Sequence, residues 1–125
     1  MRVLLVDDHP LFIDGLNNLL TSRGIEVVGR ARDGLEALQQ ARALSPDLIF
    51  MDIHLPDENG LELTKRIKSQ YPHIKIVILT VYDFPEYREA AQRCGVEDFV
   101  IKGLTSWKEI VVLVKSISSK IGKPI

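Results

Sequence analysis

The sequence predicts a single α/β domain in which one parallel sheet of five strands is covered by helices on both faces. Five short, almost wholly apolar runs recur along the chain, and segments with helical spacing of apolar residues lie between them. Runs without polar alternation are typical of strands that are buried on both faces. Strict alternation of strand and helix with short connections indicates a doubly wound (βα)5 sandwich of three layers.

The first apolar run, residues 3–6, ends in Asp7 and Asp8, so it is interpreted as a strand and not as part of a signal peptide. A helix is predicted after it, opened by Pro10 and closed by Gly24. Its apolar stripe has the spacing of one helix face and consists of Phe12, Leu16, Leu19 and Leu20.

The second run, residues 27–31, is followed by Asp33 and Glu36, which have the spacing of a capping box. This pattern predicts a second helix through Leu38 and Ala41.

The third run, residues 48–51, precedes a helix that ends before Pro72 and whose apolar positions are Leu61, Leu63 and Ile67. The fourth run, residues 76–79, precedes a helix opened by Pro85 and stopped by Gly95. Its inward positions are Tyr87, Ala90, Ala91 and Cys94, which makes the cysteine a core residue more than a reactive one.

The fifth run, residues 99–101, is followed by a second capping-box pattern, Ser106 with Glu109. The helix that it predicts carries an apolar stripe formed by Ile110, Leu113, Val114, Ile117 and Ile121. Residues 122–125 contain Gly and Pro and turn polar, as at the end of a domain. We therefore expect one domain over residues 1–121, with residues 122–125 as a tail or the start of a linker.

A second apolar stripe on this last helix allows two interpretations. Trp107, Val111 and Val114 lie at i, i+4 and i+7, partly apart from the core stripe. The stripe is either a partner surface, which makes a homodimer through this helix a hypothesis, or part of one broad buried face.

Composition excludes several classes of protein. The 125 residues carry 16 Lys and Arg against 17 Asp and Glu, a formal charge of −1, which argues against a domain built to grip nucleic-acid phosphates. The one cysteine cannot form an internal disulfide, and no apolar run has the length of a membrane span. A cytoplasmic protein without membrane contact is expected.

Polar residues follow the apolar runs where the predicted strands end. Asp7 and Asp8 follow the first strand, Asp52 the third, Thr80 the fourth and Lys102 the fifth. The carboxyl ends of parallel strands share one edge, and ligands of open α/β sheets bind there, at the switch in strand order. With the order 2-1-3-4-5, the acids of strands one and three face each other across this switch.

Three neighbouring carboxylates repel one another, and a raised pKa or a bound cation relieves the repulsion. Oxygen ligands suit Mg²⁺, and a carboxylate can accept a phosphoryl group as a nucleophile. Lys102 supplies a charge and Thr80 a hydroxyl for phosphate oxygens. Each of these residues alone is an ordinary turn or cap residue, so the joint pattern carries the inference. His9 and His54 flank the acids, but hard oxygen ligands outnumber them and favour Mg²⁺ over a transition metal.

Four segments that contain these residues form a specific pattern: residues 3–8, 50–60, 78–80 and 99–102. With them the chain resembles, over nearly its whole length, the receiver domains of two-component response regulators, which have a flavodoxin-like fold. Residues 7–12, 15–16 and 34–37 are similar to the NarL/LuxR-type branch, whose members usually carry a C-terminal helix-turn-helix domain that binds DNA. No such domain lies within these 125 residues.

The resemblance implies roles for individual residues. Asp52 would take a phosphoryl group from a sensor histidine kinase, and Mg²⁺ would be held by Asp7, Asp8, Asp52 and the backbone carbonyl of His54. Thr80 and Phe99 would act as switch residues, and Lys102 would bind a phosphate oxygen. The lifetime of the phosphate would depend on His54 and Tyr82, and an aromatic Tyr82 predicts a long-lived phosphorylated state. Val81 stands where a small residue is usual and would narrow access to Asp52.

Two other functions are weighed against this one. A receiver-like interaction domain that works without phosphorylation is disfavoured by the complete set of Asp8, Asp52, Thr80 and Lys102. A small metal-dependent phosphohydrolase with Asp52 as nucleophile is disfavoured because His54 stands where an Asp-x-Asp motif needs its second acid. The expected protein is thus no enzyme beyond its own phosphotransfer and dephosphorylation.

Overall fold

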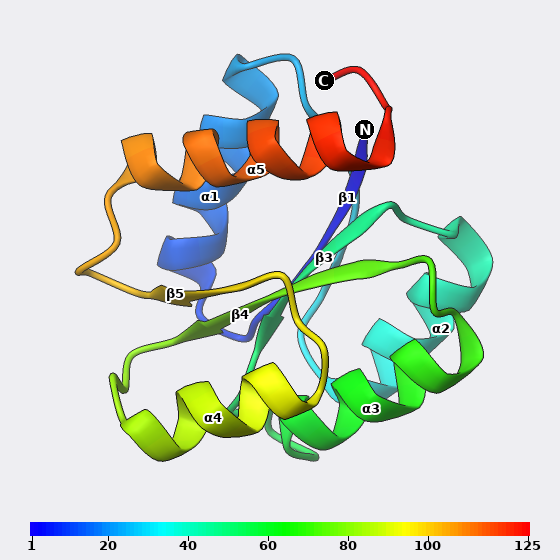
Figure 1. Ribbon diagram of the computed structural model, residues 1–125, viewed down its shortest axis with the longest axis vertical. Helices are drawn as coiled ribbons and strands as arrows, with labels where there is room; N and C mark the ends of the chain where they lie inside the picture. The colour runs from blue at the N-terminus through cyan, green and yellow to red at the C-terminus, as the bar shows by residue number, and fades with distance from the viewer.

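The computed structural model describes residues 1–125 and shows five strands and five helices in strict alternation (Figure 1). The strands are β1 (Arg2–Val6), β2 (Glu26–Ala31), β3 (Leu48–Asp52), β4 (Lys75–Thr80) and β5 (Asp98–Ile101). The helices are α1 (Pro10–Ser22), α2 (Gly34–Leu44), α3 (Gly60–Gln70), α4 (Pro85–Arg93) and α5 (Trp107–Ile121). All strand pairs are parallel in the order β2-β1-β3-β4-β5, which confirms the predicted topology.

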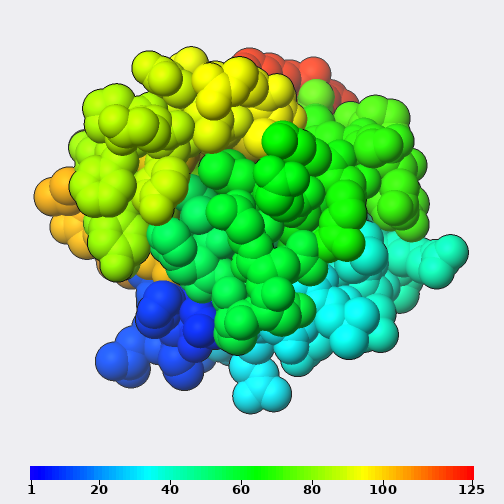
Figure 2. All heavy atoms as spheres, turned by 90° about the horizontal axis from the view of Figure 1, so that it is seen from below, coloured from blue at the N-terminus to red at the C-terminus, as the bar shows by residue number.

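Two apolar cores lie on opposite faces of the sheet. Helices α1 and α5 cover one face, and α2, α3 and α4 cover the other, where they lie side by side (Figures 1 and 2). Successive residues of β1 serve both cores, since Leu4 packs with α2 and α3 whereas Leu5 packs with α1 and α5. Burial on both faces explains why the central strands lack polar alternation.

The outer strands depart from the expectation of burial on both faces. In β2 only Ala31 is buried, and in β5 only Val100 and Ile101 are. Both strands lie at an edge of the sheet, where one side of the strand has no neighbour and the helices cover it incompletely. The prediction of full burial is therefore wrong for these two runs.

The predicted helix starts and stops are confirmed. The N-caps of α2 and α5 are Asp33, whose Oδ1 accepts from the N–H of Glu36 at 2.8 Å, and Ser106, whose Oγ accepts from the N–H of Glu109 at 3.0 Å. Gly24, just past the end of α1, has a φ of 76°, which glycine adopts without strain.

The second apolar stripe on α5, formed by Trp107, Val111 and Val114, is mostly buried within the domain. Val111 is 5% exposed and Val114 fully buried, so both belong to one broad buried face. Trp107 alone reaches solvent, with 44% of its surface exposed, and its ring packs 5.7 Å from that of Phe12. Of the two interpretations of this stripe, one broad buried face is therefore confirmed for Val111 and Val114, and a homodimer through α5 stays a prediction. Cys94 is half-buried, with its Sγ 3.8 Å from the carbonyl oxygen of Leu61. None of the helices is both long and apolar enough to span a bilayer.

Candidate functional site

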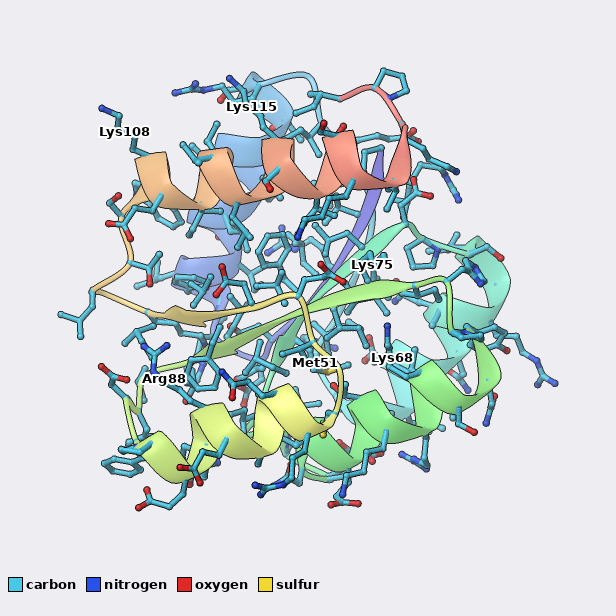
Figure 3. All side chains as sticks on the ribbon, viewed as in Figure 1. Met51, Lys68, Lys75, Arg88, Lys108 and Lys115 are labelled. Atoms are coloured by element: carbon cyan, nitrogen blue, oxygen red, sulfur yellow. The ribbon has the colours of Figure 1, made fainter.

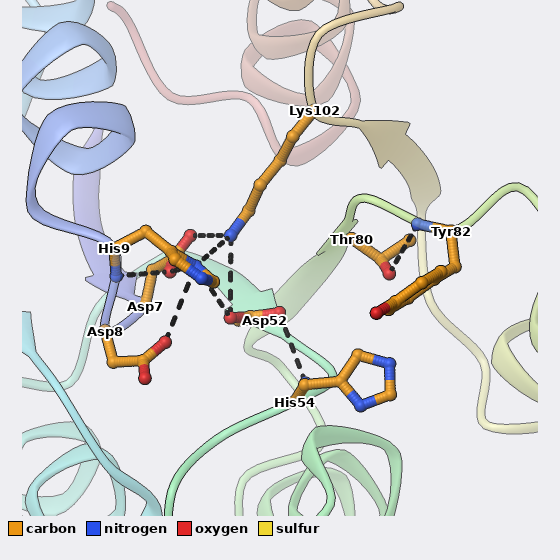
Figure 4. Close-up of polar contacts among 8 residues, drawn as sticks. All are labelled: Asp7, Asp8, His9, Asp52, His54, Thr80, Tyr82 and Lys102. Carbon is orange, nitrogen blue, oxygen red and sulfur yellow. Dashed lines mark hydrogen bonds and ion pairs between the residues drawn. The ribbon is translucent and has the colours of Figure 1, made fainter.

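The carboxyl ends of β1, β3, β4 and β5 bring the predicted polar residues to one edge of the sheet (Figure 4). Asp7 and Asp8 follow β1, Asp52 ends β3, Thr80 ends β4 and Lys102 follows β5. Because β1 pairs with β3 on one side and β2 on the other, the chain reverses its direction of winding here, and the loops diverge to leave a crevice.

Three carboxylates gather in this crevice. Ligand atoms of Asp7, Asp8, Asp52 and His9 lie within 4.8 Å of one another. The side chains of Asp7 and Asp52 are 0% and 2% exposed, respectively. Asp8 Oδ1 and Asp52 Oδ2 are buried oxygens without a hydrogen-bond partner, and Asp7 Oδ2 has only the ammonium of Lys102 as a partner, 2.5 Å away. Unpaired buried oxygens at this density fit a cation-binding site.

Lys102 is the one cation buried among them. Its Nζ lies 2.5 Å from Asp7 Oδ2 and 3.5 Å from Asp52 Oδ2, and the side chain is 7% exposed. Three carboxylates and one ammonium leave a formal charge of −2 in the crevice. One divalent cation would neutralise this charge, so the acidic cluster can hold such an ion.

The electrostatics raise the pKa of Asp52 to about 6. Burial of the carboxyl group is the main cause, and the neighbouring charge of Asp7 adds to it. Lys102 and the N–H of His54, which donates to Asp52 Oδ1 at 3.2 Å, oppose the rise. Asp52 is therefore ionised at neutral pH but more basic than an ordinary aspartate.

Asp52→Asn should stabilise the metal-free protein at neutral pH, by about 1–3 kcal/mol. In the folded chain the pKa of Asp52 is about 6, which is higher than its ordinary value of 3.8. Ionisation of Asp52 therefore lowers the free energy of unfolding. This penalty is absent below about pH 4, grows as pH rises and is complete above about pH 6. Urea unfolding in EDTA at pH 4.5 and 7.5 measures the difference between variant and wild type. A difference that does not change with pH would contradict the assigned cause.

Thr80 is fully buried, and its hydroxyl is held by its own loop. The Oγ1 accepts a hydrogen bond from the N–H of Tyr82 at 3.1 Å (Figure 4). One strand further, Phe99 is half-buried beside Ile78 of β4. The guanidinium of Arg88 reaches from α4 toward β5 and lies 5.0 Å from the centre of the Phe99 ring (Figure 3).

Aromatic and apolar side chains border the pocket. It encloses about 180 Å³ and is lined by Asp8, His9, Asp52, His54, Val81, Tyr82 and Lys102. The rings of His54 and Tyr82 meet edge to face at 5.1 Å. Val81 is 54% exposed at the mouth, which is where a side chain can restrict access to Asp52.

One contribution to the site, that of Asp57, was not predicted from the sequence. Asp57 accepts hydrogen bonds from the N–H groups of Gly34 at 2.7 Å and Leu35 at 3.1 Å, and these bonds lower its pKa. It thereby ties the loop after Asp52 to the N-terminus of α2. His9 was expected to flank the acids, and the structure places its Nδ1 2.9 Å from Asp7 Oδ1. The contact of Asp57 has no signal in sequence spacing, because it depends on how the loops after β2 and β3 converge.

The family model for the response regulator receiver domain matches residues 3–115. The chain belongs to this family. Among curated relatives, the receiver domain is 40% identical over 121 residues to the response regulator protein VraR of Staphylococcus aureus, covering 94% of the chain and 56% of the relative. It is 38% identical over 104 residues to the response regulator GacA of Pseudomonas viridiflava, covering 82% and 49%. The receiver domain thus spans about half the length of the curated relatives it matches.

Solved structures agree with the fold and the branch. A LuxR-family two-component response regulator from Aurantimonas superposes on the receiver domain with a TM-score of 0.88 and 32% identity, covering 98% of this chain and 86% of the other. A two-component response regulator from Clostridium difficile gives a TM-score of 0.91 and 26% identity, covering 98% and 99%. The resemblance to the NarL/LuxR-type branch is therefore confirmed, because a solved member of the LuxR family is among these similar structures.

Proposed function

We propose that Asp52 accepts a phosphoryl group from a sensor histidine kinase in a Mg²⁺-dependent reaction, and that this changes the output surface of the domain. The observation that carries the proposal is a nearly buried Asp52 with an unpaired Oδ2, placed between two further acids and the Lys102 ammonium. In this proposal residues 1–121 form the receiver domain in the cytoplasm. Residues 122–125 then lead to a DNA-binding helix-turn-helix domain through which the parent protein controls transcription.

The donor set fits Mg²⁺, because unpaired carboxylate oxygens and a formal charge of −2 suit a hard divalent ion. Asp7, Asp8, Asp52 and the backbone carbonyl of His54 would hold it. When bound, the ion supplies positive charge that neutralises phosphoryl oxygens during transfer.

The chain's own residues account for the chemistry at phosphorus. A carboxylate oxygen of Asp52 forms a bond to phosphorus, the phosphorus–nitrogen bond of the donor phosphohistidine breaks, and the imidazole leaves with its electron pair and gains a proton. The ammonium of Lys102 lies 3.5 Å from Asp52 Oδ2, within reach of a phosphoryl oxygen that becomes attached there.

The switch follows from the contacts of Thr80. A hydroxyl that turns to donate to the new phosphoryl group gives up the N–H of Tyr82. Movement of Thr80 frees space beside β5, and a matching rotation of Phe99 would disturb the Arg88 stack. The face formed by α4, β5 and α5 is then the surface that changes.

Intact-mass measurement after incubation with acetyl phosphate, with and without Mg²⁺, tests the proposal. The expected result is one phosphoryl adduct that requires Mg²⁺ and is absent from Asp52→Ala. A folded protein that binds Mg²⁺ but forms no adduct would point to a kinase-only donor or to obstruction by Val81. Absence of both adduct and Mg²⁺ binding would leave the interaction domain that works without phosphorylation.

Tyr82→Ala should shorten the lifetime of the phosphorylated protein about threefold or more. The Tyr82 ring lines the pocket beside Asp52, so its removal admits water to the acyl phosphate. Decay of the adduct, followed by mass after removal of acetyl phosphate, measures the effect. Tyr87→Ala is the matched control, because Tyr87 belongs to the same ring cluster, 6.5 Å from Tyr82, but does not line the pocket. Equal decay rates for the two variants would show that Tyr82 gives no special protection.

A further inference from the structure

The imidazole of His9 lies among the carboxylates of the site. Its Nδ1 is 2.9 Å from Asp7 Oδ1, 3.5 Å from Asp8 Oδ1 and 3.7 Å from Asp52 Oδ2. His9 directly follows the two acids and begins the turn into α1, so its ring is directed by the local backbone, whose N–H also donates to Asp7 Oδ1 at 2.9 Å. The His54 ring, in contrast, packs against Tyr82 and Tyr87.

Hydrogen bonding alone does not explain this position of His9. The same Nδ1 is 2.9 Å from Asp7 Oδ1 and 3.0 Å from Lys102 Nζ. If Nδ1 carries a proton, it can donate to Asp7 but faces the N–H donors of Lys102. If Nδ1 has no proton, it can accept from Lys102 but its lone pair faces the carboxylate. One of the two contacts is therefore repulsive in either tautomer, even though Asp7 Oδ1 also accepts from the backbone N–H of His9.

A metal ion bound beside the Lys102 ammonium would use the nitrogen lone pair together with two oxygens that have no hydrogen-bond partner, Asp8 Oδ1 and Asp52 Oδ2. Ligands of a divalent transition ion lie about 2.0–2.2 Å from it, which places neighbouring ligands about 3.0–3.4 Å apart. The three distances from His9 Nδ1 to carboxylate oxygens, 2.9, 3.5 and 3.7 Å, are close to that spacing. Asp52 Oδ2, on a side chain that is 2% exposed, has no hydrogen-bond partner and lies 3.5 Å from the Lys102 ammonium, so this oxygen is available to a further cation.

We propose that His9 Nδ1 completes a mixed nitrogen and oxygen site with Asp7, Asp8 and Asp52, which binds Zn²⁺ or Mn²⁺ through a direct metal–nitrogen bond. An imidazole ligand raises affinity for first-row transition ions, whereas Mg²⁺ prefers oxygen ligands and water. The site therefore discriminates among divalent ions through one residue that the phosphoryl chemistry does not require. This inference rests on the acidic site of the proposed function but not on phosphorylation itself.

Metal binding to the full chain tests the inference without an activity assay. His9→Gln should weaken Zn²⁺ binding, measured by competition with a chelating dye, about tenfold or more. Mg²⁺ affinity should stay within about twofold. His73→Gln is the matched control, because His73 is exposed in the turn before β4, at the opposite edge of the sheet.

A second readout uses the unaltered protein, so it does not depend on the variant folding. Pulsed electron paramagnetic resonance of the Mn²⁺ complex should show a nitrogen coupling that changes when histidine is labelled with ¹⁵N, and that is lost in His9→Gln. Mg²⁺ binding without any histidine coupling and with unchanged Zn²⁺ affinity in His9→Gln would overturn the mixed site and leave the proposed function intact. A histidine-dependent Zn²⁺ or Mn²⁺ site that does not bind Mg²⁺ would support the mixed site and overturn the Mg²⁺-dependent function.

Discussion

Gly60→Ala should destabilise the protein by about 3 kcal/mol or more, because no side chain fits where α3 begins. A Cβ on Gly60 would lie 2.0 Å from the backbone oxygen of Asp52 and 3.0 Å from the Cα of Ile53. Both obstacles are backbone, which cannot move aside as a flexible side chain can. The Gly60 N–H also donates to the carbonyl of Ile53 at 2.7 Å, which fixes the close approach.

The same substitution should slow phosphorylation, since the strand end that carries Asp52 must shift to admit the new methyl group. Urea unfolding and the rate of adduct formation with acetyl phosphate measure the two effects. Gly24→Ala is the control: its φ of 76° strains an alanine, but nothing lies within 4 Å of the new Cβ. It should lose only about 1–2 kcal/mol and keep the rate of the wild type. Equal stability of the two variants would show that the approach of Gly60 to β3 is not tight.

Lys102→Met should destabilise the metal-free protein by about 3–5 kcal/mol at neutral pH. The methionine fills similar space but leaves Asp7 and Asp52 buried without their 2.5 and 3.5 Å ammonium partner. Lys102 opposes the raised pKa of Asp52, so the variant's Asp52 should titrate above about 6. The loss of stability should therefore shrink as pH falls and Asp52 becomes protonated.

Phosphorylation of the Lys102→Met variant should slow by about 100-fold, because one charge that stabilises the phosphoryl oxygens is gone.

Urea unfolding in EDTA at pH 5 and 7.5, together with adduct formation at saturating Mg²⁺, checks these effects. Lys75→Met is the matched control, since its ammonium lies 3.7 Å from Glu97 and is 31% exposed. A pair of this kind contributes about 1 kcal/mol or less. If Lys102→Met is as stable as Lys75→Met at pH 7.5, then the ammonium does not neutralise the acidic cluster.

The order of elements and the place of the site could be predicted because both depend on local patterns. Apolar runs reveal the central strands, and the residues just after a strand must lie at its carboxyl end, so Asp52 and Lys102 could be located without coordinates. The capping pairs of α2 and α5 are equally local, which is why Asp33 and Ser106 take their predicted roles.

Contacts between loops could not be predicted, because they depend on the angles at which chain segments converge. The hydrogen bonds that Asp57 accepts from the start of α2 are of this kind, and so is the approach of His9 to Asp52. Burial on α5 stayed open between two interpretations for a related reason. Val111 lies outside the core stripe of the helix, and only the tertiary packing shows that it is buried.

The strength of the hydrogen bond from the Tyr82 N–H to Thr80 Oγ1 limits how completely the unphosphorylated domain stays in its resting state. A single neutral hydrogen bond contributes about 1 kcal/mol net, so a switch restrained by it alone would favour the resting rotamer only about five to one. About one molecule in six would then adopt the other rotamer without any phosphoryl group, and full activation could raise output only about sixfold. A wider dynamic range requires a second restraint, and the stacking of Arg88 on Phe99 is placed to provide it.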